Sequence, residues 1–379
     1  MREVFLTIIC LIVFSCSKDK DNGTTSIKEY SFGESNSELM YKDSDDVSEI
    51  TSSDLRYEIG KIIRVKPIDN FTIEVANFAP IDLEDIKILA QIDGIDQQLN
   101  FFKINKINAH ATKQVRYSFL DEGTLFNSTT GEKIDLTEYK ESGIGTENIT
   151  FNFSGDSEIL TKLKSLNKLN WEIKWHDYNL YNDPNDKWKL DIAPKDARRL
   201  SGLMINLGYM LVSKEFEQEF LNEVIFDNEK DTLNQTEKEL VFNKLLDLDY
   251  FQVGIPTTTS GRGGAPYVFG LAEHILNGYM TSPGRPFTWI AVHEIGHMLG
   301  YYHDSNMTYP SPRYPTPEEE ANGIYPQGIS EVGTRIAELL QTRGDFIVTP
   351  NNYYKPEDFT DNSSRNKRHF HVLGACDID

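Results

Sequence analysis

Residues 289–310 read WIAVHEIGHMLGYYHDSNMTYP, and this stretch decides how the second half of the chain folds. His293 and His297 are four residues apart, so on a helix their imidazoles lie one turn apart on the same face. Glu294 follows His293 directly, where a carboxylate can act on a bound water without being a ligand itself. The spacing therefore predicts a helix that presents two metal ligands and a general base.

A third histidine follows the expected end of this helix. Gly300 can adopt a positive φ and turn the chain, which would return His303 to the point that the first two imidazoles face. Three imidazoles leave a fourth coordination position open, as in catalytic zinc sites, whereas structural zinc is closed by four protein ligands. We therefore expect one catalytic Zn²⁺ ion held by His293, His297 and His303.

Residues 293–304, HEIGHMLGYYHD, resemble the HExxHxxGxxH signature, here followed by Asp304, of the metzincin clan of zinc endopeptidases. The clan places a methionine in a turn beneath the metal, and Met307 is the one methionine after His303. Tyr309 completes a Met-x-Tyr arrangement similar to that of astacin-like and serralysin-like members, in which the tyrosine helps to hold the oxyanion. Only three residues separate His303 from Met307, fewer than in most familiar members.

The resemblance implies a zinc-dependent endopeptidase that acts on protein or peptide substrates. A zinc-activated water would attack the peptide carbonyl, with Glu294 as the general base. The resemblance also implies an edge strand for substrate, a wall of the pocket after the scissile bond, and a closing helix, for which the candidates are residues 268–272, 310–317 and 330–340. Residues 261–264 lack the spacing and the lysine of a phosphate cradle, so we interpret them as a flexible loop.

The first half of the chain has the pattern of short strands. Apolar and polar residues alternate with the period of half-buried strands in segments 61–65, 71–75, 86–89, 114–119, 148–153 and 171–175. Turn residues separate the segments, which favours a β-sandwich. We assign residues 55–190 to an Ig-like β-sandwich domain and residues 191–379 to a metzincin-like catalytic domain with a mixed sheet. The expected fold class is α+β, with a boundary near the turn-rich residues 181–186.

Helical signals begin the second half. Pro194 suits a first helical position, and apolar residues recur at three- and four-residue spacings from Ala197 to Leu211. Thr236 and Glu239 have the spacing of a capping box, which predicts a second amphipathic helix.

The N-terminus resembles a bacterial lipoprotein signal. Residues 4–14 are almost wholly apolar, but a helix that crosses a bilayer needs about 20 such residues. Residues 13–16, VFSC, resemble a lipobox, so we expect residues 1–15 to be a signal peptide and Cys16 to carry lipid. Residues 16–54 are polar and predict a solvated tether. The protein would then be a lipoprotein of the bacterial outer membrane or cell surface, attached through Cys16 only.

Composition narrows the range of partners. The 379 residues include 59 acidic and 38 basic side chains, which gives a formal charge of -21. This charge repels phosphate backbones, so we exclude nucleic acid as a partner. The three cysteines, Cys10, Cys16 and Cys376, offer no disulfide framework. We expect a monomer.

Three alternatives stay open. A glutamate among residues 318–320 could replace His303 as third ligand, as in gluzincins. The protein could be a catalytically inactive surface adhesin on the same fold, although Glu294 and the three histidines are intact. The β-sandwich could be an inhibitory pro-domain instead of a permanent domain. The remaining histidines stand apart in the sequence, and we expect His110 and His176 on the surface and His369 and His371 in an exposed tail.

Overall fold

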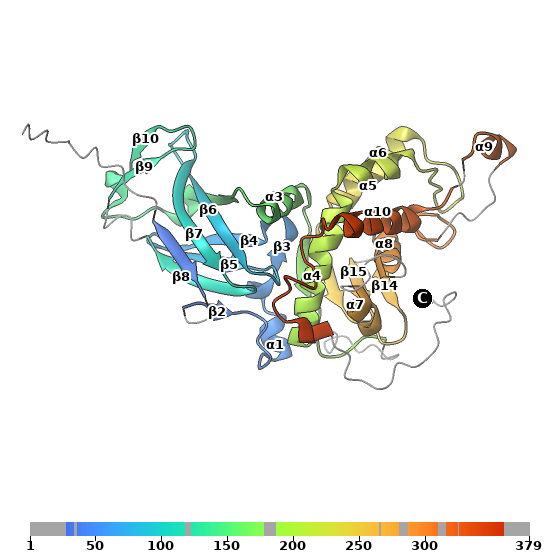
Figure 1. Cartoon of the computed structure of the whole chain (residues 1–379), viewed down its shortest axis with the longest axis horizontal. Helices are drawn as coiled ribbons and strands as arrows, with labels where there is room; N and C mark the ends of the chain where they lie inside the picture. The colour runs from blue at the N-terminus through green and yellow to red at the C-terminus, as the bar shows by residue number, and fades with distance from the viewer. Residues whose placement is uncertain are drawn as a thin grey trace, which may run out of the picture.

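The computed structural model places most sheet strands at one end of the chain and most helices at the other (Figure 1). It describes residues 28–33, 36–117, 123–177, 187–264, 267–279, 287–309, 316–324 and 326–359. The predicted signal, Cys16, the turn at 181–186, residues 310–315 of the predicted pocket wall, and the tail with His369, His371 and Cys376 lie outside the described residues. The mixed α+β class is confirmed. No helix in the described ranges is long and apolar enough to cross a membrane.

Two four-stranded sheets form most of the first half. One has the order β1-β7-β6-β11, with β1 at Glu29–Phe32, β7 at Leu99–Ile107, β6 at Leu83–Ile92 and β11 at Ile149–Ser154. The other has the order β2-β8-β5-β4, with β2 at Glu38–Leu39, β8 at Ala111–Arg116, β5 at Thr72–Asn77 and β4 at Ile63–Asp69. Every neighbouring pair is antiparallel except β1 and β7. Inward side chains of both sheets, such as Val75 and Ile88, belong to one apolar core.

Five of the six predicted strand segments lie in these two sheets, as parts of β4, β5, β6, β8 and β11. Strands β1 and β2 of these sheets were not predicted, and neither was β7. Its neighbouring residues Phe101 and Phe102 are both buried, and this breaks the alternation on which the prediction relied. A small hairpin of β9 (Leu125–Asn127) and β10 (Lys133–Asp135) lies beyond the two sheets.

The predicted tether is folded over the part that the structure describes. Strands β1 and β2 and helix α1 (Val47–Ile50) lie within residues 16–54, and Phe32, Tyr41 and Ile50 are buried. The expectation of a solvated spacer is therefore wrong for residues 28–33 and 36–54. A few apolar side chains are enough to attach a polar segment to a core, and an average over composition hides them.

A five-stranded sheet with the order β14-β15-β13-β12-β3 forms the frame of the second half. Its strands are β3 (Tyr57–Glu58), β12 (Glu172–Trp175), β13 (Tyr250–Gly254), β14 (Gly261–Gly264) and β15 (Val268–Leu271). The three central strands are parallel to one another, and β3 and β14 are antiparallel at the two edges.

Two of these five strands come from the range assigned to the sandwich. The segment predicted at 171–175 pairs as β12 with β13, and β3 pairs with β12. The assignment of residues 171–175 to the sandwich is therefore wrong. Alternation identifies the buried face of a strand but not the strand beside it, so the sequence pattern could not show this pairing.

The edge of the sheet also differs from the prediction. Residues 268–271 form β15, which lies between β13 and β14 and is not an edge. Residues 261–264, interpreted as a flexible loop, form β14, the outermost strand of this sheet within the described ranges.

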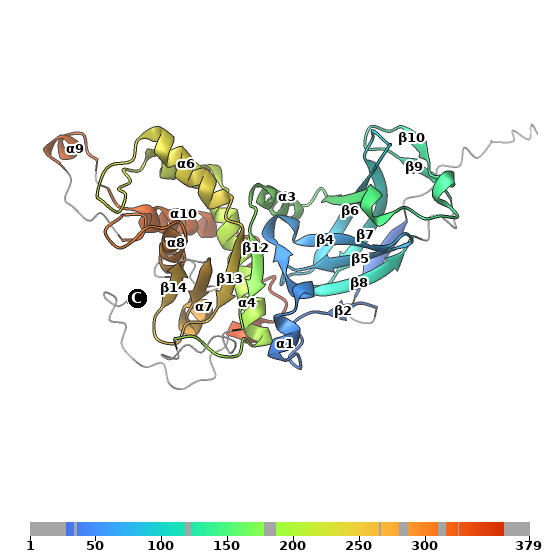
Figure 2. The same cartoon turned by 180° about the vertical axis from the view of Figure 1, so that it is seen from behind.

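Helix α4 (Pro194–Leu211) lies between the two halves (Figures 1 and 2). Pro194 occupies the first turn as predicted, and nearly every residue from 196 to 211 is buried because both halves cover the helix. Helix α6 (Gln235–Leu246) begins earlier than predicted, since Asn234 and Glu237 form its capping box in place of Thr236 and Glu239. The predicted helix at 330–340 is confirmed as α10 (Ile329–Arg343).

The other helices are shorter than α4 and α10, and one of them, α8, carries the histidine motif. They are α3 (Glu158–Ser165), α5 (Lys214–Asn222), α7 (Glu273–Tyr279), α8 (Phe287–Met298) and α9 (Pro317–Ala321). Single 3-10 turns are η1 (Ser53–Leu55), η2 (Ile59–Lys61), η3 (Thr137–Tyr139), η4 (Thr146–Asn148), η5 (Leu166–Lys168) and η7 (Pro356–Phe359).

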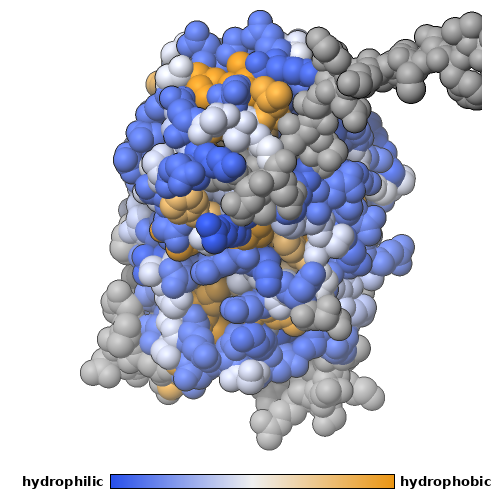
Figure 3. Space-filling model, turned by 90° about the vertical axis from the view of Figure 1, so that its left-hand side faces the viewer, coloured by the Kyte–Doolittle hydropathy of each residue, from blue (hydrophilic) through white to orange (hydrophobic). Residues whose placement is uncertain are grey.

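The surface at the sheet end is mostly hydrophilic, with separate apolar groups (Figure 3). Among the described residues between 28 and 177, the exposed large apolar side chains are Leu39, Ile68 and Leu125. Single exposed apolar residues are normal on a protein surface and indicate no docking site.

Arg198 of α4 connects the two halves. Its side chain is 1% exposed and donates hydrogen bonds to both carboxylate oxygens of Asp358, at 2.7 and 2.6 Å, and to the carbonyl of Tyr41, at 2.7 Å. Asp358 lies in η7, which the chain reaches after crossing α4 from the end of α10 (Figure 1). The ion pair therefore joins the N-terminal residues, the central helix and the end of the described chain.

We predict that Asp358→Asn lowers the free energy of unfolding by about 3 kcal/mol, because it leaves the buried Arg198 guanidinium without its bidentate partner. Urea denaturation monitored by circular dichroism measures the change. Asp156→Asn is the control, since Asp156 pairs with Lys87 on the surface with 91% of its side chain exposed, and we expect little change there. Equal effects of the two substitutions would contradict the role of Arg198.

Candidate metal centre

Helix α8 brings two of the three predicted ligands together. His293 and His297 lie one turn apart on it, and their Nε2 atoms are 3.1 Å apart. The helix packs between the five-stranded sheet and α10 (Figure 2). His293 is fully buried, whereas His297 is half-buried.

Gly300 ends the helix as predicted. Its φ is +97°, its N–H donates to the carbonyl of His297 at 3.0 Å, and the N–H of Tyr301 donates to the carbonyl of Gly296 at 3.0 Å. This pair of hydrogen bonds is the Schellman motif, which favours glycine at the left-handed position. The turn brings His303 back, and its Nε2 atom lies 3.1 Å from that of His297. One ligand atom from each of the three histidines lies within 4.8 Å of the others.

Main-chain carbonyls determine which ring nitrogens face the centre. The Nδ1 atom of His293 lies 2.9 Å from the carbonyl of Thr308, and that of His297 lies 2.7 Å from the carbonyl of Tyr301. A carbonyl oxygen only accepts, so each Nδ1 must carry the hydrogen and donate it. In a neutral imidazole this leaves a lone pair on Nε2, the usual arrangement of a metal-binding histidine.

The converging lone pairs fit a cation. The Nε2 lone pairs of His293 and His297, whose atoms lie 3.1 Å apart, repel unless a positive charge lies between them. Two nitrogens bound to zinc at about 2.0–2.1 Å in a tetrahedron lie about 3.3 Å apart, close to the observed separation. Imidazole ligands suit zinc, copper, iron or nickel. The three histidines together could therefore hold a metal ion.

The electrostatic surroundings keep the three rings neutral. Burial lowers the pKa of His293 to about 3, and the neighbouring His297 and His303 lower it too, against the opposing effect of the hydrogen bond to Thr308. Burial also lowers the pKa of His297 and of His303. Only the neutral imidazole can bind a metal, so this part of the fold prepares the ligands.

Glu294, the predicted general base, is 1% exposed and lies against strand β14. A Cβ on Gly261 would be 2.5 Å from the Oε1 atom of Glu294, and a Cβ on Gly263 would collide with its main-chain carbonyl. The glycines of residues 261–264 therefore let a strand lie directly on α8. Glycine-rich composition had suggested flexibility, but close approach of two backbones requires the same residue.

Met307 lies in a tight turn packed against α8. It is 2% exposed, and the N–H of Thr308 donates to the carbonyl of Ser305 at 3.3 Å within the turn. A Cβ on Gly296 would lie 2.6 Å from the carbonyl of Met307 and 2.9 Å from the Cγ2 atom of Thr308. Gly296 thus permits the turn to approach the helix, a role that the sequence analysis did not assign to it.

The ring of Tyr309 packs on the histidine cluster. Its ring centroid lies 4.9 Å from that of His293 and 4.6 Å from that of His303, with the rings nearly perpendicular. Trp289 stacks on His293 at 5.2 Å. The structure thus places the predicted tyrosine in direct contact with two of the three ligands, and it adds Trp289 to the same aromatic group.

The other acidic residues considered for the metal site are not grouped with the three histidines. Asp304 forms an exposed ion pair with Lys230 at 3.0 Å, with 66% of its side chain exposed. Residues 318–320 belong to α9, which projects from the molecule in Figure 1, and they are absent from the group of possible metal ligands in the described part of the chain. The gluzincin alternative therefore has no support in the geometry.

His110 was expected on the surface and is instead fully buried, so that expectation is wrong. It packs edge to face on Tyr41 at 4.9 Å and on Tyr354 at 5.7 Å, and neither ring nitrogen has a hydrogen-bond partner among the described residues. Burial, with a further effect of Arg198, lowers its pKa to about 3. An isolated histidine in a sequence can be a core aromatic, and no local pattern distinguishes that role from an exposed one.

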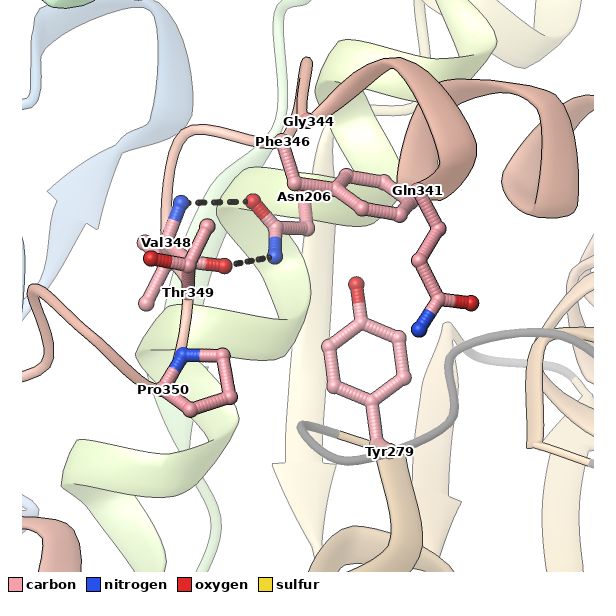
Figure 4. A pocket seen from close by; sticks show the side chains of 8 residues that line it. All are labelled: Asn206, Tyr279, Gln341, Gly344, Phe346, Val348, Thr349 and Pro350. Carbon is pink, nitrogen blue, oxygen red and sulfur yellow. Dashed lines mark hydrogen bonds between the residues drawn. The ribbon is translucent and has the colours of Figure 1, made fainter.

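A small cavity lies away from the metal centre, at the end of α10 (Figure 4). Its volume is about 70 Å³, and its lining includes Asn206, Tyr279 and Phe346. Asn206 donates to the carbonyl of Val348 at 2.6 Å and accepts from its N–H at 2.9 Å, as Figure 4 shows. The asparagine thus serves to hold the loop after α10.

We predict that Gly263→Ala destabilises the protein by about 1–3 kcal/mol, as overpacking does, because the new methyl group meets main chain that cannot move aside. Gly261→Ala should cost less, since the obstructing atoms belong to the side chains of Glu294 and Ile290. Urea denaturation measures both. Gly33→Ala serves as control, since a Cβ there would meet nothing within 4 Å, and a cost equal to that of Gly263→Ala would refute the explanation.

We predict that the metal-free protein loses stability as the pH falls from about 6.5 toward 3. In this window the unfolded chain protonates its histidines, while His110 and His293 in the folded chain stay neutral, so protons favour unfolding. His110→Phe should make the free energy of unfolding less pH-dependent by up to about 1.4 kcal/mol per pH unit. Urea titrations at several pH values test this, and parallel curves for the two proteins would contradict it.

No protein-family model matches this chain, and no curated protein or solved structure matches it either.

Proposed function

We propose that this chain is a zinc-dependent endopeptidase of the metzincin type. The observation that carries the proposal is the convergence of three imidazoles, with main-chain carbonyls setting the tautomers of His293 and His297, in a motif that also contains the buried Glu294. A zinc ion bound there would polarise a peptide carbonyl and lower the pKa of a water molecule. The three-histidine donor set, without cysteine, supports a catalytic ion over a structural one.

Glu294 is the group that moves the proton. It follows His293 directly on α8, and its carboxylate does not belong to the converging set of ligand atoms. It would accept a proton from the attacking water and donate it to the nitrogen of the leaving amine. The contact with Gly261 restricts the position of its Oε1 atom, which favours a single productive orientation.

We propose that Tyr309 stabilises the oxyanion. Its ring lies over His293 and His303, so its hydroxyl can approach the space in front of the ligands. A phenol that donates a hydrogen bond there would act when negative charge develops on the carbonyl oxygen. Met307 supports this arrangement from below through its contact with Gly296.

Strand β14 is the proposed site of substrate binding. It is the outermost strand of the sheet within the described ranges and lies directly on α8 beside Glu294. An extended peptide could pair with its free edge by strand addition, which would bring a peptide bond to the metal centre. This role belongs to residues 261–264 and not to residues 268–272, because β15 is paired on both sides.

We propose that the N-terminal sheets form a permanent Ig-like domain and not a removable pro-domain. Removal of residues 55–190 would take β3 and β12 out of the five-stranded sheet that carries β14. It would also remove Trp171, whose indole N–H donates to the carbonyl of Leu245 at 2.9 Å. A pro-domain whose loss dismantles the protease frame could not activate it.

The cellular location is proposed from the sequence. Residues 13–16 and the apolar run before them support lipidation of Cys16 and attachment at the outer membrane or cell surface. Protein or peptide substrates outside the cell would then reach the protease.

The test of this function is Glu294→Gln in the full chain. The wild type should bind one zinc ion and cleave a peptide library in a chelator-sensitive way. The variant should keep the zinc and lose about 10²–10⁴-fold in kcat/KM, the usual contribution of a general base. Zinc content is measured by mass spectrometry and cleavage by fluorescence.

Glu338→Gln on the exposed face of α10 is the matched control and should leave both quantities unchanged. Undiminished cleavage by Glu294→Gln would refute the assigned base. Absence of bound metal in the wild type would refute the function as a whole.

A further inference from the structure

A segment distant in sequence runs beside the loop that carries the third ligand. Residues 224–228 contact residues 300–306 through side-chain hydrogen bonds. The hydroxyl of Ser305 donates to the carbonyl of Phe226 at 2.6 Å, and Asn306 accepts from the N–H of Phe226 at 2.8 Å and donates to the carbonyl of Val224 at 2.7 Å. Phe226, Ser305 and Asn306 are buried, so these bonds are shielded from water.

Asn228 is the residue of this segment that bonds to the main chain just before His303. Its Nδ2 atom donates to the carbonyl of Gly300 at 3.0 Å, and its Oδ1 atom accepts from the N–H of Tyr302 at 2.7 Å. One side chain thus bridges the main chain on either side of Tyr301, within the four residues that separate the end of α8 from His303.

The other polar groups of this connection are also bound. The N–H of Tyr301 donates to the carbonyl of Gly296, and the carbonyl of Tyr301 accepts from His297. The carbonyl of Tyr302 accepts from the hydroxyl of Thr308 at 2.8 Å. The main-chain groups of residues 300–302 therefore all have hydrogen-bond partners. Asn228 is the partner of the Gly300 carbonyl and of the Tyr302 N–H.

His303 depends on this main chain more than the other ligands do. The Nδ1 atoms of His293 and His297 are oriented by carbonyls, whereas that of His303 has no hydrogen-bond partner among the described residues. Like His297, His303 is half-buried, whereas His293 is fully buried. Its position is therefore determined by the backbone of residues 300–303 and by the contact with Tyr309.

We infer that Asn228 is a positioning residue for the third metal ligand, which it holds in place by clamping the main chain on the N-terminal side of His303. The inference rests on the proposed metal function of the three histidines. Asn228 touches neither metal nor substrate and acts through the backbone. Its loss should allow residues 300–303 to move and should weaken metal binding before it affects the rest of the fold.

The test compares Asn228→Ala with Asn352→Ala in the purified full chain. Asn352 makes the same pair of bonds elsewhere, since it donates to the carbonyl of Ile347 at 2.9 Å and accepts from the N–H of Thr349 at 2.7 Å. Both asparagines are half-buried. The two variants should therefore show similar decreases in Tm in the absence of metal.

Metal affinity separates the two variants. We expect Asn228→Ala to bind Zn²⁺ about 10-fold more weakly, in the range found when groups that support a ligand are removed, and to alter the visible spectrum of bound Co²⁺. Asn352→Ala should keep the wild-type affinity and spectrum. Competition with a chromophoric chelator measures the affinity. Equal affinity of Asn228→Ala and wild type would overturn the inference.

A double-mutant cycle tests whether the effect passes through His303. In the His303→Ala background, Asn228→Ala should cause no further loss of affinity, whereas an undiminished 10-fold loss would show that Asn228 acts elsewhere. If Asn228→Ala does not fold, Asn228→Leu keeps the volume and removes both hydrogen bonds. A wild type that binds no metal would refute the proposed function, and this inference with it, whereas a wild type that binds metal with an unaffected variant would refute this inference alone.

Discussion

The hydrogen bonds from His293 to Thr308 and from His297 to Tyr301 are the interactions on which the rest of the metal centre depends. Each carbonyl accepts the proton of Nδ1, so each Nε2 presents a lone pair to the same small space. Two lone pairs in such a space repel one another unless a cation is bound. Both acceptors lie beyond the end of α8, which means that the loop after the helix, and not the helix alone, orients the ligands.

Close backbone approach is the second constraint, and three glycines satisfy it. Gly261 and Gly263 let β14 lie on α8, and Gly296 lets the turn at Met307 lie against the same helix. The helix is therefore enclosed by main chain on two sides, with α10 completing its surroundings. Adding a single methyl group at one of these glycines would therefore displace Glu294 or the ligands. Glycine here provides precision, because the surrounding chain removes the freedom that the residue would have in isolation.

The two halves of the chain are less separate than a division at residue 190 implies. Strands β3 and β12 extend the sheet that carries β14, and Arg198 joins Tyr41 to Asp358 across α4. An N-terminal region that supplies strands to the five-stranded sheet contributes to the stability of that sheet. It would do so whether or not it also binds partners.

The sequence by itself determined the local features: the histidine spacing on α8, the turn at Gly300, the helices α4 and α10, and five strands of the two N-terminal sheets. These depend on periodicity and on the φ preference of glycine, which act over a few residues. Only the tertiary structure decided that β12 pairs with β13, that residues 261–264 form an edge strand, that His110 is buried, and that Asn228 holds the main chain before His303. Such contacts join residues far apart in the chain, and a hydrogen bond between them leaves no periodic trace in the sequence. The convergence of the three histidines was therefore predictable from one short motif, whereas the contacts that hold them in place are distributed over distant segments.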